Sequence, residues 1–182
     1  MTIDDYRIAL AEANRHGWGF LAAYGTTWLV CGVVWSRASP RVGAFFTLFQ
    51  GLAALPVALL LTALTPGPAT PTMPGLDTLV ILLASGQLLG LPIVIYLTMA
   101  KRYTMVPLAM ALLVAVHFAP YSWLYATPLY LVMGGLVSVG AAVAQSVGDR
   151  PDRGDDAARG PMLLCFVVGG VMALSAAVAV VL

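Results

Sequence analysis

The sequence predicts an all-α integral membrane protein that crosses the bilayer several times. Only 9% of its residues are charged, whereas 60% are hydrophobic, and a soluble domain carries roughly 25% charged residues. The apolar residues also fall in long runs without polar alternation. Because a segment in lipid must satisfy its backbone hydrogen bonds internally, such runs favour helices over strands.

Six apolar runs reach the roughly 20 residues that a helix needs to cross the hydrocarbon core. The connections between them are short, so we expect a single six-helix transmembrane domain over residues 1–182 and no separate soluble domain. Pro92 predicts a kink toward the end of the third run. The predicted spans cover residues 17–35, 43–64, 76–100, 104–125, 128–147 and 161–182.

Residues 1–16 are more polar and predict a short additional helix. Thr2 and Asp5 have the spacing of a capping box. Four apolar residues share one face of this helix: Ile3, Tyr6, Leu10 and Ala13. The sequence leaves two interpretations open. The segment is either an amphipathic helix on the outer leaflet or a helix continuous with the first span.

The basic residues are distributed unevenly between the two sides of this arrangement. The connections after spans one, three and five carry Arg37, Arg41, Lys101, Arg102, Arg150, Arg153 and Arg159. The opposite side holds only Arg7 and Arg15. Because cytoplasmic loops are enriched in Lys and Arg, we predict that these three connections are cytoplasmic and that both termini are outside.

Small residues recur at four-residue steps within the spans, and in lipid such steps allow helices to approach closely. We therefore expect a tight bundle and a homo-oligomer that forms through these faces. Cys31 and Cys165 both lie toward the predicted cytoplasmic side, so we expect buried free thiols rather than a disulfide. The small-residue steps are Gly19, Ala23, Thr27 and Cys31; Gly86 and Gly90; Gly134, Ser138 and Ala142; and Gly169 and Ala173.

The segment from His117 to Tyr130 is the main candidate for a functional site. Most of its aromatic residues fit the belt that Trp and Tyr form at a membrane interface. His117 differs, because a rise of 1.5 Å per residue places it about 12 Å below the outer end of the fourth span. The same rise places Gln87 about 15 Å down the third span from the same side.

Two interpretations of His117 remain open. It is either a structural imidazole that hydrogen-bonds to a neighbouring helix, or part of a cavity that opens outward and is lined by His117, Gln87 and Tyr121. In the second case Pro120 breaks the helix, and the freed carbonyls face the cavity.

Two further residues near the outer surface are secondary candidates. Asp77 opens the third span, where a carboxylate favours the positive end of the helix dipole. Trp123 lies at the level of the aromatic belt.

The run His117, Phe118, Pro120, Tyr121, Trp123, Leu124 and Tyr125 carries a resemblance to known proteins. With the polar tail and the Trp-containing first span, it resembles a family of small multi-spanning bacterial membrane proteins of uncharacterised function. The resemblance implies a multi-pass protein of the bacterial plasma membrane and implies no activity. Eight arginines against one lysine also point to a GC-rich bacterial genome.

The chain lacks the residue patterns that membrane enzymes use. Ser138 is not in a Gly-x-Ser-x-Gly context, the two histidines are too far apart for a metal site, and no phosphate-binding glycine motif is present. We therefore expect no enzyme, cofactor, metal or nucleic-acid partner, and we expect the lipid bilayer as the main partner. The favoured function is non-catalytic binding of a ligand, lipid or partner, or its regulation. The alternative is a small-molecule transporter with a cavity near His117, and an intramembrane enzyme ranks third.

Overall fold

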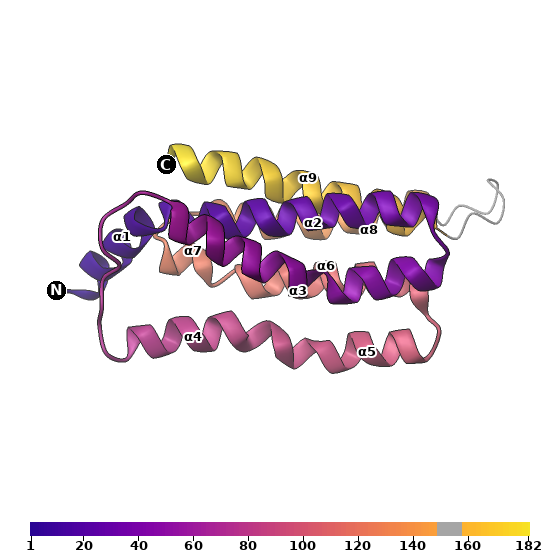
Figure 1. Ribbon diagram of the computed structural model, residues 1–182, viewed down its shortest axis with the longest axis horizontal. Coiled ribbons are helices and arrows are strands. Elements are labelled where there is room, and N and C mark those ends of the chain that lie inside the picture. The colour runs from indigo at the N-terminus through magenta and orange to yellow at the C-terminus, as the bar shows by residue number, and fades with distance from the viewer. Residues whose placement is uncertain (149–157) are drawn as a thin grey trace.

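The computed structural model describes residues 1–148 and 158–182, and these residues form helices joined by short connections. Six helical segments are long and apolar enough to cross a membrane, which confirms the predicted fold class and is typical of a multi-pass membrane protein. Figure 1 shows these segments running side by side, with both termini at the same end of the bundle.

Two of the six spans are interrupted in the structure. Span one is α2 (Trp18–Arg37) and span two is α3 (Pro40–Leu64). Span three consists of α4 (Leu76–Gly86), the 3₁₀ turn η2 (Gln87–Gly90) and α5 (Leu91–Met99). Span four consists of η3 (Tyr103–Met105), α6 (Val106–Phe118) and the short α7 (Tyr121–Leu124). Spans five and six are α8 (Leu129–Gly148) and α9 (Arg159–Val181).

The N-terminal segment forms the separate helix α1 (Ile3–Ala13). The capping box is present, because the Asp5 N–H donates to Thr2 Oγ1 at 3.1 Å and the Thr2 N–H donates to Asp5 Oδ2 at 2.8 Å. The 3₁₀ turn η1 (Arg15–Gly17) then interrupts the helix, because the φ angles from Arg15 to Gly17 are positive. The interpretation that this segment is a helix continuous with span one is therefore wrong. Instead, α1 turns away across the end of the bundle (Figure 1).

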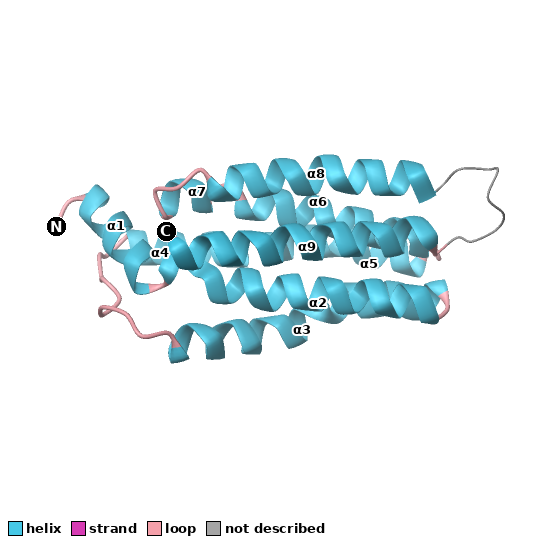
Figure 2. Cartoon of the chain, turned by 90° about the horizontal axis from the view of Figure 1, so that it is seen from above, coloured by secondary structure: helices cyan, strands magenta, loops and turns pink. Residues whose placement is uncertain are grey.

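The helices pack around α2 and α9, which lie next to each other (Figure 2). A methyl group on Gly25 of α2 would lie 2.9 Å from the backbone nitrogen of Ala173 on α9, so the two backbones touch. This close approach uses small residues, as expected for helices in lipid. On the other sides, α2 packs against α3, α9 against α8, and α8 against α6. Cys31 and Cys165 are both free and buried in this core, as predicted.

Span three lies apart from the other spans, as Figure 1 shows at the bottom of the bundle. Only 6% of its apolar window is buried, against 33–50% in the other five spans. Its helix is interrupted at η2, between Gly86 and Gly90. Pro92 explains the break, since it lacks the N–H that would bond the Leu88 carbonyl. The kink predicted from Pro92 therefore occurs in the middle of the span.

The basic residues of the connections gather at one end of the bundle. Arg37 and Arg41 flank the connection between α2 and α3, which lies at the end opposite the two termini (Figure 1). Lys101 and Arg102 follow α5, and Arg159 begins α9 at the same end. Arg150 and Arg153 lie outside the described residues. That the Arg-rich end is cytoplasmic stays a prediction.

Candidate functional site

Two adjoining cavities lie between span three and the rest of the bundle. The inner cavity has a volume of about 270 Å³ and lies between α2, α3, α6 and the η2–α5 part of span three. The outer cavity, of about 200 Å³, lies nearer the chain termini, under α4. Tyr24, Leu55 and Gln87 line both cavities and so form the boundary between them.

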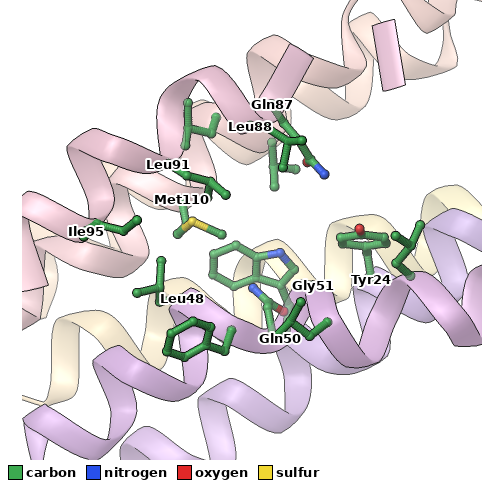
Figure 3. Close-up of a pocket in the computed structure, with 15 residues that line it drawn as sticks. Tyr24, Leu48, Gln50, Gly51, Gln87, Leu88, Leu91, Ile95 and Met110 are labelled. Carbon is green, nitrogen blue, oxygen red and sulfur yellow. The ribbon is translucent and has the colours of Figure 1, made fainter. Parts of the chain in front are cut away.

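The polar part of this boundary is formed by Tyr24 of α2 and Gln87 of span three. Figure 3 shows the Gln87 side chain pointing from span three into the cavity, with Tyr24 on the opposite wall. The Gln87 amide lies near the Tyr24 hydroxyl. Gln87 begins the 3₁₀ turn η2, and a mid-helix 3₁₀ stretch often marks a functional hinge.

Two buried polar atoms at the inner cavity have no partner among the described residues. They are Nε1 of Trp28, whose side chain is fully buried, and Oε1 of Gln50, which is 5% exposed. Both residues line the inner cavity. A buried donor or acceptor without a hydrogen bond costs about 1–3 kcal/mol. The other lining residues of this cavity are mostly apolar, with Ile95, Met110 and Phe49 among them.

Aromatic rings surround the outer cavity. The His117 ring lies 5.6 Å from the Tyr121 ring and 5.1 Å from the Phe118 ring, measured between centroids. Tyr130 lies 5.8 Å from Tyr121, and its hydroxyl donates to the backbone carbonyl of His16 at 2.6 Å. Among the described residues the His117 imidazole has no hydrogen-bond partner, and its ring packs against the Phe118 and Tyr121 rings.

Pro120 interrupts span four just beyond His117. The helix α6 ends at Phe118 and α7 begins at Tyr121. Pro120, His117 and Gln87 line a third hollow, a lateral groove between α4 and α6. His117 and Gln87 border both the groove and the outer cavity, so the two hollows adjoin at these side chains.

Asp77 and Trp123 hold α1 in place and do not line the inner or outer cavity. The Tyr6 hydroxyl donates to Asp77 Oδ1 at 2.8 Å, and Asp77 Oδ2 accepts the Met73 N–H at 3.1 Å. Burial, and then the hydrogen bond to Asp77, raise the pKa of Tyr6 to about 12. The Arg7 guanidinium donates to the Trp123 carbonyl at 2.6 Å and lies 4.7 Å from the centroid of its ring.

The structure thus brings together the residues that sequence reasoning placed at one depth. His117, Gln87 and Tyr121 line the outer cavity, and Pro120 lines the adjoining lateral groove. The secondary candidate Asp77 lies in the first turn of α4, where the dipole argument placed it.

Sequence reasoning missed the inner cavity and three of its four polar residues, Tyr24, Trp28 and Gln50. The sequence did contain a signal for Gln50, because its side chain carries the only amide in the apolar run of residues 43–64. Trp28 lies in the middle of span one, away from the interfaces where Trp is enriched. Tyr24 offers no comparable signal.

The sequence matches one family model over residues 3–153, and that model describes a family of unknown function, DUF7010. The matched residues include the run from His117 to Tyr125. No curated protein and no solved structure matches the chain.

Proposed function

Because the chain belongs to DUF7010, a family of unknown function, we propose a function from its cavities. The protein is a membrane-embedded receptor that binds a small, uncharged, mainly apolar molecule between span three and the rest of the bundle. The observation that carries this proposal is the loose packing of span three over two adjoining cavities. We also place the protein in the bacterial plasma membrane, with both termini outside.

The lining and the size of the cavities support an apolar ligand. Among the described residues, no Asp, Glu, Lys or Arg lines either cavity, so a charged ligand would lack a counter-charge. The inner cavity alone, at about 270 Å³, approaches the lower end of the range of about 300–1,000 Å³ for ligand pockets. The outer cavity extends it toward the membrane surface.

The position of span three supports access from the lipid. Most of its apolar surface is exposed, and the lateral groove reaches His117 and Gln87 between α4 and α6. The break at η2 gives the span a point at which its two halves can move relative to each other. A ligand dissolved in the bilayer would therefore pass beside span three and need not cross an aqueous path.

A small-molecule transporter is the second candidate. It is favoured by His117, Gln87 and Tyr121, which line a cavity near the predicted outer end. Transport requires a change that opens the inner cavity to the opposite end, and the break in span three is the point where such a change would occur. Uptake into vesicles separates transport from binding alone.

Filling the inner cavity tests the proposed binding. A methyl group on Gly51 would meet only the Tyr24 hydroxyl, at 3.9 Å, so Gly51→Leu fills the cavity without a backbone clash. Gly135 of α8 has nothing within 4 Å, and Gly135→Leu is the matched control on the outer face. The probes are tritiated dodecane and dodecan-1-ol, with protein in nanodiscs and a scintillation proximity readout.

We expect saturable binding of both probes to the wild type and to Gly135→Leu. Gly51→Leu should weaken that binding at least tenfold. Non-saturable uptake by the wild type, or equal binding by the two leucine variants, would refute the proposed site.

A further inference from the structure

We propose that the ligand of the inner cavity carries a hydroxyl group, and that Trp28 and Gln50 recognise it. This inference rests on the proposed function and names the chemical class of its ligand. The class is an uncharged, membrane-soluble alcohol or phenol with an apolar body. The observation behind it is that the two unpartnered polar atoms belong to residues that line the same apolar cavity.

The two atoms differ in their hydrogen-bonding character. Trp28 Nε1 carries a hydrogen and can only donate, whereas Gln50 Oε1 can only accept. A hydroxyl group is the smallest group that accepts one hydrogen bond and donates another. It therefore offers both of the bonds that the two protein atoms lack.

Other ligand classes satisfy the site less well. An ether or ketone would accept from Trp28 and leave the Gln50 carbonyl without a donor. A hydrocarbon would leave both atoms unpaired. A carboxylate or an ammonium group would be buried without a counter-charge, because the described lining contains no residue that is charged at neutral pH.

The remaining polar side chains of the inner cavity are Tyr24 and Gln87, which lie at its boundary with the outer cavity. Figure 3 shows Gln50 on the wall opposite Gln87. Both unpartnered atoms are closed to water in this structure. A ligand hydroxyl would therefore reach them only after both side chains shift, so that the Gln50 amide and Trp28 Nε1 face the cavity.

Single substitutions at the two residues separate this idea from a purely structural role. Trp28→Phe removes the donor and keeps an aromatic ring, and Gln50→Leu removes the amide and keeps a similar volume. Because Gln50→Leu removes a buried acceptor that has no partner and keeps a similar volume, it should not lower the melting temperature of the ligand-free protein. Trp28→Phe leaves a small cavity at a fully buried position and should lower the melting temperature somewhat, so this variant is judged by the order of its probe affinities. Trp123→Phe is the matched control for the indole, since Trp123 lies outside both cavities.

The experiment measures the saturable binding of three tritiated probes to protein in nanodiscs: dodecan-1-ol, its methyl ether and dodecane. The wild type and Trp123→Phe should bind dodecan-1-ol about tenfold more tightly than the ether, and the ether more tightly than dodecane. Gln50→Leu should reduce the affinity for dodecan-1-ol to that for the ether. Trp28→Phe should make the ether no better than dodecane.

The possible results separate the two proposals. Saturable binding of all three probes with equal affinity would overturn the hydroxyl recognition and leave the binding site intact. A preference for dodecan-1-ol that persists in both variants would also overturn it. If no probe binds saturably, the proposed function fails, and this inference fails with it. A lower melting temperature of ligand-free Gln50→Leu would show that the amide has a structural partner and would count against the proposal.

Discussion

The contact between α2 and α9 can be tested with two adjacent glycines of α9. A methyl group on Gly169 would lie 2.8 Å from the backbone nitrogen of Leu29 and 2.9 Å from the Gly25 carbonyl oxygen. A methyl group on Gly170 would meet nothing within 4 Å. The change from Gly to Ala is the same at both positions, and both lie inside one helix.

The expected magnitudes follow from this difference. Replacing Gly by Ala in a helix interior stabilises it by about 0.5–1 kcal/mol, so Gly170→Ala should stabilise the protein by that amount. Gly169→Ala gains the same propensity but forces two backbones apart, and such overpacking costs about 1–3 kcal/mol. Because the propensity gain is common to both variants, Gly169→Ala should be less stable than Gly170→Ala by about 1–3 kcal/mol.

The assay is equilibrium unfolding of the two variants and the wild type, by titrating sodium dodecyl sulfate into dodecyl maltoside micelles. Helix loss is followed by circular dichroism. If both alanine variants are stabilised equally, α2 and α9 do not meet at Gly169, and the packing around α2 described above is incorrect. The reciprocal variant Gly25→Ala should behave like Gly169→Ala, because its methyl group would also meet backbone.

Three further predictions concern other parts of the molecule. The pKa of Tyr6 is raised from 10.0 to about 12, so its contribution to stability is complete below pH 10 and is lost as the pH rises toward 12. Melting temperatures between pH 8 and 12 should show this loss in the wild type, and Tyr6→Phe, which cannot bond Asp77, should lack this Tyr6-linked component. Ser122 Oγ accepts a backbone N–H at the start of α8 at 2.8 Å, so Ser122→Ala should lower the unfolding free energy by about 1–3 kcal/mol; an unchanged value would show that water replaces the serine. For the orientation, an impermeant maleimide should label Thr70→Cys in intact cells and leave Ala100→Cys unlabelled, and the reverse pattern would invert the predicted topology.

The sequence alone could predict the features that depend on composition or on local spacing. Run length and the scarcity of charge predicted six apolar helices, because a helix that crosses lipid needs about 20 such residues. The spacing of Thr2 and Asp5 predicted the capping box that begins α1. Counting residues along two spans placed His117 and Gln87 at similar depths, and both line the outer cavity.

Only the tertiary structure decided which faces of the helices meet. In a soluble protein the apolar face of a helix identifies its buried side, but in lipid both faces are apolar and that signal is lost. The sequence therefore did not show that span three packs loosely, or that Trp28 and Gln50 line one cavity. It also left open the path of the chain after α1, which depends on the positive φ angles at Arg15, His16 and Gly17. These features depend on close contacts between distant residues, whereas the number of helices depends on how much apolar chain lies between the polar connections.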